Sequence, residues 1–287
     1  MANEPLRTPS ASTSAIATRL LSVLLIGSVS IWAQYEASRG FDITIVNDAH
    51  GTPSARRFDL LFVSNDKATR IILNTSNFVE QILYSGGDTH EEVIVLPTKP
   101  VDRVILRLVQ MSSSSDRVSV VVSPGKKAGE FVIGINSAIM EEKNPNVAMV
   151  AAVQRGMARV WLWNGRKGVP RSLLEGMVEY IASLAGISPS PESARLMRHG
   201  SGSCWTEDDP AAVAQFLRFC EAKRRGFFAR LNRAMKEDWE PRMMDEALGI
   251  PVRRLCSLYH SVITATLSPS ANTTSDLVAE EILNQDA

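Results

Sequence analysis

The histidine and serine side chains of this chain form none of the common catalytic patterns. His90 is followed by Glu91, but it lacks the second histidine that a helical zinc site requires. The chain has no G-x-S-x-G nucleophile motif and no glycine-rich phosphate loop. The other histidines are scattered, and we expect all of them to be surface or capping residues: His50, His199 and His260.

Three cysteines lie in the C-terminal third of the chain, at Cys204, Cys220 and Cys256. They are too few for a disulfide framework and lack the paired C-x-x-C spacing of a structural zinc site. At least one of them must be unpaired within the chain. Two interpretations stay open: all three are buried apolar cysteines, or Cys204 and Cys220 form a disulfide, which needs an oxidising compartment.

The most informative segments are V-Q-R-G-M-A-R-V-W-L-W-N-G at 153–165 and P-R-S-L-L-E-G-M-V-E-Y-I-A-S-L-A-G at 170–186. This pair resembles the signature region of the plant basic secretory protein family, which consists of zinc metallopeptidases. In that family one helix carries H-E-x-x-H and then V-W-Q-W-N-G, and the next helix carries a motif of the type L-I-E-G-I-A-D-Y. The resemblance extends over roughly 41–262. Leu174 and Glu179 are conservative replacements of family residues. The residues that match the family motifs are Val160, Trp161, Trp163, Asn164, Gly165, Leu173, Glu175, Gly176 and Tyr180.

At the positions of the family's H-E-x-x-H motif this chain has Arg155, Gly156 and Arg159. Two histidines at i and i+4 on a helix bind one Zn²⁺, and the intervening glutamate activates the metal-bound water. A guanidinium group has no lone pair to give and stays protonated, and glycine cannot accept a proton. We therefore expect no zinc cofactor and no hydrolysis by the family mechanism.

The resemblance leaves Glu175 as the retained carboxylate, which by analogy with gluzincin-like peptidases would be the third metal ligand. We predict that Arg155 or Arg159 occupies the place of the metal and forms a partly buried ion pair with Glu175. The alternative is that both arginines point into an open cleft without a partner. The candidate cleft residues are Trp161, Trp163, Asn164, Glu179 and Tyr180. Tryptophans at such positions are more often part of the core.

The charge balance argues against a nucleic-acid partner. The 287 residues include 31 basic and 31 acidic ones, so the formal net charge is zero, and affinity for phosphates needs clustered, uncompensated Lys and Arg. The basic stretch K-R-R-G-F-F-A-R at 223–230 is typical of a helix that alternates a solvated face with a core face. The neutral balance also departs from the basic character in the family name.

Strand patterns precede helix patterns along the chain, which indicates an α+β fold. Short β-branched runs predict strands at 41–46, 91–96, 101–109, 117–122 and 131–135. Apolar residues at three- and four-residue steps between Ala68 and Ile82 predict a helix that packs on this sheet. Later segments predict helices at 146–163, 171–185, 210–223, 226–236, 240–248 and 251–265. The resemblance implies a zincin-like, gluzincin-type arrangement of these elements.

The N-terminus resembles an export or anchoring signal. Residues 1–19 are polar, and 20–35 contain an uncharged apolar run that is short for a helix crossing about 30 Å of hydrocarbon and suits a signal peptide. Because Arg19 can extend a tilted span, a single-pass anchor stays open, and so does a buried helix. Basic residues before the run place the large C-terminal part in the lumen or outside. Sequons at Asn74 and Asn272 are compatible with this location.

We therefore predict one peptidase-like domain at 41–265, followed by a polar tail at 266–287. The predicted function is that of a catalytically inactive homologue, which binds an unidentified peptide or protein partner in the secretory pathway or the apoplast. The resemblance implies a defence-related setting. Two alternatives remain: an active zinc metallopeptidase with non-standard ligands, and a structural membrane-anchored ectodomain.

Overall fold

The computed structural model describes residues 21–28, 30, 40–84, 98–111, 119–187 and 204–267. The chain divides into two compact units, Met1–Asp42 and Ile43–Ala287. In the first unit, residues 21–28 are helical and carry exposed apolar side chains such as Leu24 and Ile26. Within the described ranges, no helix is both long enough and apolar enough to cross a membrane.

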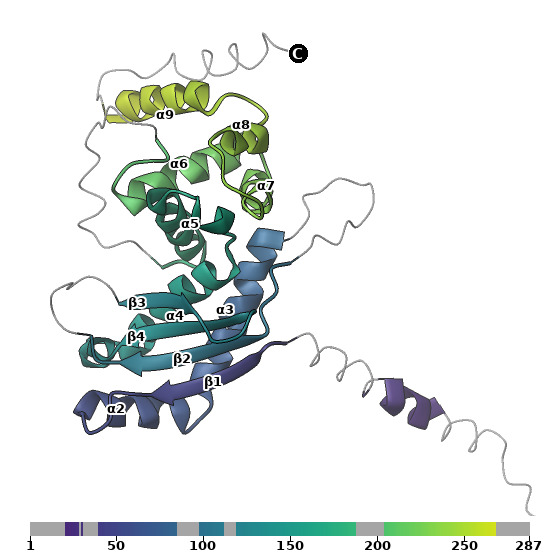
Figure 1. The fold of residues 1–287 in the computed structure, drawn as a ribbon, viewed down its shortest axis with the longest axis vertical. Helices are drawn as coiled ribbons and strands as arrows, with labels where there is room; N and C mark the ends of the chain where they lie inside the picture. Colours follow the sequence, from purple (N-terminus) through teal and green to yellow (C-terminus); the bar gives the residue numbers. More distant parts are fainter. Residues whose placement is uncertain are drawn as a thin grey trace, which may run out of the picture. The chain divides into compact units, whose positions relative to one another are not determined.

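The second unit contains a four-stranded sheet in the order β1-β2-β4-β3 (Figure 1). β2 runs parallel to β4, with Leu106 opposite Ile133, whereas β3 is antiparallel to β4 and lies at one edge. The predicted strand at 91–96 and the first residues of the one at 117–122 lie outside the described residues. The strands are β1 (Asp42–Asn47), β2 (Arg103–Val109), β3 (Val120–Pro124) and β4 (Glu130–Asn136).

Most of the helices follow the last strand along the chain, and the α+β class predicted from the sequence is confirmed. The α-helices are α2 (Pro53–Phe58), α3 (Lys67–Tyr84), α4 (Pro145–Trp161), α5 (Arg171–Leu184), α6 (Pro210–Lys223), α7 (Phe227–Ala234), α8 (Arg242–Leu248) and α9 (Val252–Leu267). Shorter helical turns occupy Asp59–Val63, Ser137–Glu141 and Gly165–Lys167. The sequence patterns did not predict these turns or α2, whereas every predicted helix is present with ends shifted by at most a few residues.

Local sequence explains where the two central helices begin and how closely they pack. The Asn144 side chain accepts a hydrogen bond from the Val147 amide, and Pro145 occupies the first turn of α4, where its missing N–H costs nothing. On α5, Gly176 permits the close approach of α6, because a Cβ atom there would collide with Val213. These local features fix where α4 begins and how closely α5 packs on α6.

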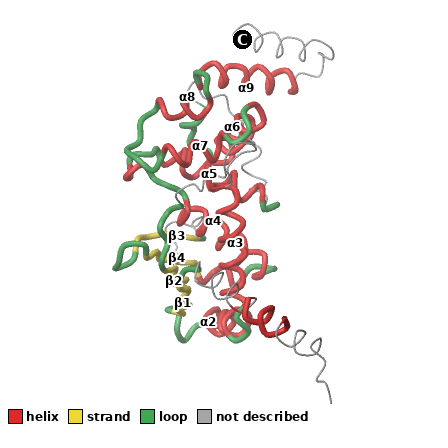
Figure 2. The backbone as a smooth tube through the Cα atoms, turned by 90° about the vertical axis from the view of Figure 1, so that its right-hand side faces the viewer, coloured by secondary structure: helices red, strands yellow, loops and turns green. Residues whose placement is uncertain are grey.

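Helix α4 is the central element of this unit. It packs against α3 and α5 and against the strands β3 and β4. In Figure 2 the strands lie on one side of this unit, and α3 and α4 lie together on the other side. Fully buried apolar residues such as Val153 and Met157 of α4 and Ile133 of β4 form the core between them. The finer expectation of a zincin-like arrangement stays a prediction.

The predicted Cys204–Cys220 disulfide is wrong, because Cys204 is bonded to Cys256 and Cys220 is a buried free thiol. Cys204 lies just before α6, and Cys220 lies near the other end of that helix. Cys204 packs on the face of α9 that carries Cys256 and His260, and its Cα atom lies 5.8 Å from that of Cys256, within the range that a disulfide needs. This packing between distant segments sets the pairing, and the spacing of the cysteines along the chain does not encode it.

One of the two sequons lies within the described residues. Asn74 is exposed in the middle of α3, with the following Thr75 and Ser76 buried. Asn272 and the rest of the polar tail beyond Leu267 lie outside the described residues, as do residues 1–19. Glycosylation at either position stays a prediction.

Peptide mapping without reductant checks the cysteine pairing. We expect a fragment that links Cys204 to Cys256, and alkylation of Cys220 only after unfolding. Burial both shields the Cys220 thiol and raises its pKa, which disfavours the reactive thiolate. A fragment joining Cys220 to either of the other cysteines would contradict the pairing.

Candidate functional site

Two arginines of α4 face two glutamates of α5. Arg155 and Arg159 are one helical turn apart, as are Glu175 and Glu179, so each set lies along one face of its helix. Arg155 Nε donates to Glu179 Oε1 at 2.7 Å, and its Nη2 donates to Oε2 at 2.9 Å. Arg159 Nη2 donates to Glu175 Oε2 at 2.5 Å, and its Nε donates to Oε1 at 3.4 Å. The two helices are joined by two parallel, bidentate ion pairs.

Both ion pairs are largely shielded from solvent. The side chains of Arg155 and Glu179 are 18% and 19% exposed, and those of Arg159 and Glu175 are 25% and 29% exposed. Arg159 is therefore the partner of Glu175, whereas Arg155 contacts Glu179, which the sequence had suggested only as a cleft residue. We expect such pairs to matter more than surface pairs, because water screens them less.

Gly156, between the two arginines in the sequence, packs directly against the sheet. A Cβ atom at this position would be 2.7 Å from Cγ2 of Ile133 on β4 and 3.4 Å from Cγ2 of Val120 on β3. Ile133 is fully buried and cannot turn away into solvent. The packing of α4 on this sheet thus requires a residue without a side chain at 156.

These residues do not fit the zinc ion that the family resemblance implies. The two guanidinium groups offer no lone pair, and Gly156 offers no side chain to act as a base. Glu175 and Glu179 have the donor chemistry for a metal, but each uses both carboxylate oxygens on an arginine. No catalytic step through zinc can be derived for this arrangement.

A cavity of about 230 Å³ lies beside the Arg159–Glu175 pair. We call it the β3 cavity, because Val122, Ser123 and Pro124 of the edge strand β3 form one of its walls. The end of α4 and one face of α5 form others. The remaining lining residues are Lys99, Phe131, Arg159, Leu162, Asn164, Leu174, Glu175 and Val178.

Lys99 places an ammonium group in the wall of the β3 cavity. Its Nζ donates to the Leu162 carbonyl at 2.6 Å and lies 5.0 Å from the ring centre of Phe131 and 5.8 Å from that of Trp163. Burial lowers the pKa of Lys99 to about 8, because the charged form loses hydration. Within the described part of the chain, no carboxylate pairs with this ammonium group.

The other predicted cleft residues separate into two groups. Asn164 lines the β3 cavity, and the ring of Trp163 faces Lys99. Trp161 and Tyr180, in contrast, are core residues: the Trp161 Nε1–H donates to the Ser76 hydroxyl at 2.8 Å, and the Tyr180 ring centre lies 4.5 Å from that of Phe228. Burial raises the pKa of Tyr180 to about 12, which keeps it neutral.

Chemical denaturation tests the strength of the paired charges. Replacing Arg155 by Met leaves the Glu179 carboxylate shielded and unpaired, so we expect a loss of about 2–3 kcal/mol in the free energy of unfolding. The double substitution Arg155→Met with Glu179→Leu removes both charges, and we expect it to cost less than the single one. The matched control is Arg242→Met in the exposed Arg242–Glu240 pair, where we expect no measurable change because solvent screens the two charges. Equal effects in Arg155→Met and the control would contradict the structural role.

Comparison of the chain with known families gives a match over most of its length. The family model BSP, described as "Peptidase of plants and bacteria", matches residues 38–259 and so includes α4, α5 and the β3 cavity. No curated protein and no solved structure matches the chain. Since the match covers most of the 287 residues, this chain belongs to the BSP family of plant and bacterial peptidases.

Proposed function

We propose that this chain is a catalytically inactive member of its peptidase family, which binds an extended peptide at the β3 edge and in the β3 cavity. The observation that carries the proposal is the double Arg–Glu pairing between α4 and α5, where the family mechanism needs metal ligands and a general base. Both arginines are bound by carboxylates, so neither they nor the glutamates are left to hold a metal.

The outer edge of β3 supplies main-chain groups for a peptide. The Asn136 amide donates to the Ser119 carbonyl, and the Gly125 amide donates to the Glu130 carbonyl. Because hydrogen-bonding residues alternate along an antiparallel pair, the backbone N–H and C=O groups of Val120 and Val122 point away from β4. No described strand pairs with that edge. An extended peptide can add to it as a further strand.

The β3 cavity supports a preference for peptides that carry a carboxylate beside an apolar side chain. Its apolar wall includes Phe131, Leu162 and Val178, which suits an aliphatic or aromatic side chain. Lys99 adds a positive charge that no described carboxylate balances. A ligand carboxylate at this ammonium group would gain a charge-assisted hydrogen bond in a partly desolvated place.

The Cys204–Cys256 disulfide supports a location outside the reducing cytosol, in line with the N-terminal apolar run. We therefore place the protein in the secretory pathway or beyond it, either released or held by residues 20–35. A defence-related setting rests on the family resemblance alone.

Metal content measured on the full chain without reductant tests the proposed loss of the zinc site. We expect no stoichiometric zinc in the unmodified protein. The variant Arg155→His, Gly156→Glu, Arg159→His restores the family ligands, but the glutamate side chain introduced by Gly156→Glu collides with Ile133, so we expect low stability and poor zinc binding. Adding Ile133→Ala opens that space, and we expect the fourfold variant to bind zinc.

Ile133→Ala alone is the control for this series, and we expect it to bind no zinc. Stoichiometric zinc in the unmodified chain, together with chelator-sensitive proteolysis, would show an active metallopeptidase with other ligands and overturn the proposal.

Peptide binding as a function of pH tests the role of Lys99. The lowered pKa means that Lys99 is charged below about pH 8 and neutral above it, so the affinity for carboxylate-bearing peptides should fall as the pH rises through this value. Lys99→Met should abolish both the affinity and its pH dependence, measured by calorimetry against a peptide library with and without acidic residues. Lys127→Met, at an exposed lysine in the β3–β4 turn, is the matched control. Binding that ignores pH and Lys99 would rule out this ligand class.

A further inference from the structure

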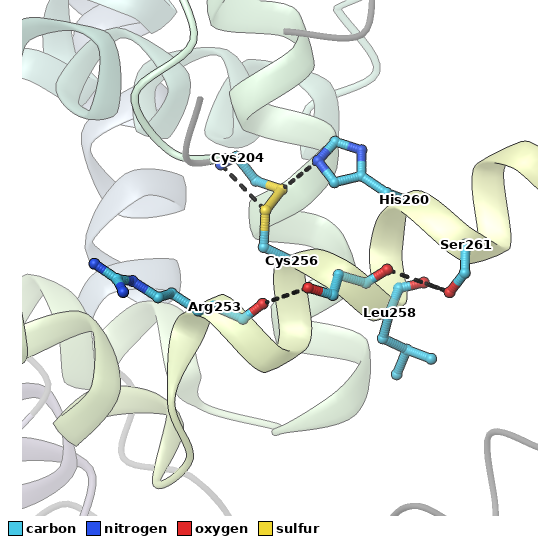
Figure 3. Close-up of a disulfide and its surroundings, with 7 residues drawn as sticks. Cys204, Arg253, Cys256, Leu258, His260 and Ser261 are labelled. Carbon is cyan, nitrogen blue, oxygen red and sulfur yellow. Dashed lines mark hydrogen bonds between the residues drawn. A yellow bond between two sulfur atoms is a disulfide. The ribbon is translucent and has the colours of Figure 1, made fainter. Parts of the chain in front are cut away.

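A cluster of side chains with metal-ligand chemistry lies at α9, and the proposed function does not use it. Cys256 and His260 are four residues apart on that helix, so both project from the same face. Cys204, from the segment before α6, meets them there: its Sγ lies 3.2 Å from Nε2 of His260 (Figure 3). The two Sγ atoms and one imidazole nitrogen all lie within 4.8 Å of one another.

Two thiolates and one imidazole are the donor set that Zn²⁺ prefers in proteins. Tetrahedral zinc has bonds of about 2.3 Å to sulfur and about 2.0 Å to nitrogen, which sets donor atoms about 3.6–3.8 Å apart. The Cys204 and Cys256 Cα atoms are 5.8 Å apart, so rotation of the two side chains can bring separated thiolates to such positions. The Sγ–Nε2 distance of 3.2 Å needs a change of only a few tenths of an ångström.

The oxidised form cannot use these ligands, because sulfur in a disulfide is not a thiolate. Two molecules of a thiol reductant would cleave the Cys204–Cys256 bond by exchange: the reductant becomes a disulfide, and the protein gains two thiols. Zinc binding then releases the two thiol protons to solvent and forms two Zn–S bonds and one Zn–N bond. His260 binds through the nitrogen that already faces Cys204.

We propose that reduction of the Cys204–Cys256 disulfide converts this cluster into a zinc site with Cys204, Cys256 and His260 as ligands. The site is half exposed on the side of Cys256 and His260. The fourth position is open to water or to Glu207, whose carboxylate interacts electrostatically with His260. Zinc would hold α9 to the start of α6 under reducing conditions, as the disulfide does under oxidising ones.

This proposal does not depend on the inactive peptidase centre, since the two clusters share no residue. It also predicts where zinc binds as a function of redox state. The Arg–Glu site on α4 and α5 gives no zinc in either state, whereas the cluster on α9 gives zinc only after reduction.

The test measures zinc in the full-length protein with and without a phosphine reductant, after anaerobic desalting, by mass spectrometry. Co²⁺ is the spectroscopic probe, because thiolate ligation produces a charge-transfer absorption. We expect stoichiometric zinc and the thiolate band only in the reduced protein. We expect Cys204→Ser to remove both the bound zinc and the thiolate band. We expect His260→Ala to weaken zinc binding by more than about tenfold, because loss of a residue that only hydrogen-bonds to a metal ligand already costs that much.

The matched control is Cys220→Ser, which removes the buried thiol of α6 and leaves the cluster intact. Reduction-dependent zinc that needs His260 and not Cys220 supports the site. Absence of reduction-dependent zinc, or binding that is equal in His260→Ala and the unmodified chain, overturns it. Equal binding in His260→Ala and the unmodified chain would also show that the chain unfolds on reduction and that its free thiols bind zinc non-specifically. Zinc in the oxidised protein that is insensitive to His260→Ala would instead count against the inactive peptidase centre.

Discussion

Two guanidinium–carboxylate pairs join α4 to α5, and their charges cancel within the interface. A zinc centre places a divalent cation among neutral and anionic ligands. Here two positive and two negative side chains compensate one another across the helix interface without a metal. Each guanidinium presents two N–H groups to two carboxylate oxygens, which fixes the orientation of the planes as well as their separation. Since partly buried charges are costly when unpaired, loss of one member exposes the full desolvation penalty of the other.

The second constraint is steric, and it makes the arrangement difficult to reverse. Gly156 permits α4 to lie close to β4, and Ile133 fills the space in which a longer side chain would need to stand. Restoring the ligands on the helix therefore affects the sheet as well. The position of β4 in turn fixes that of β3, its antiparallel neighbour, and so the wall of the β3 cavity. The absence of a side chain at 156 and the shape of the β3 cavity are consequences of the same packing.

Sequence patterns predicted the elements better than the contacts between them. Periodicity located α4 and α5 because each buries one apolar face over several turns, and the placement of Arg155 and Arg159 one turn apart follows from helix geometry. Which arginine pairs with which glutamate, Arg155 with Glu179 and Arg159 with Glu175, depends on the register between the two helices. No single segment of the sequence encodes that register. The partner of Cys204 depends on where α9 packs. Lys99 had no pattern to reveal it, since a lone lysine before Pro100 becomes a cavity residue only when Leu162 and Phe131 surround it.

In the proposed function, Lys99 binds an anionic group and takes no part in acid–base chemistry. Its Nζ donates to a carbonyl oxygen and faces two aromatic rings, and all of these groups favour the ammonium form over the neutral amine. Burial opposes that preference, and the resulting pKa of about 8 leaves the group charged at neutral pH. A ligand carboxylate would stabilise the ammonium form further, so ligand binding and protonation support each other. A general base needs a lone pair directed at the substrate, which the described contacts of Lys99 do not provide. The site is thus better suited to holding an anionic group than to reacting with it.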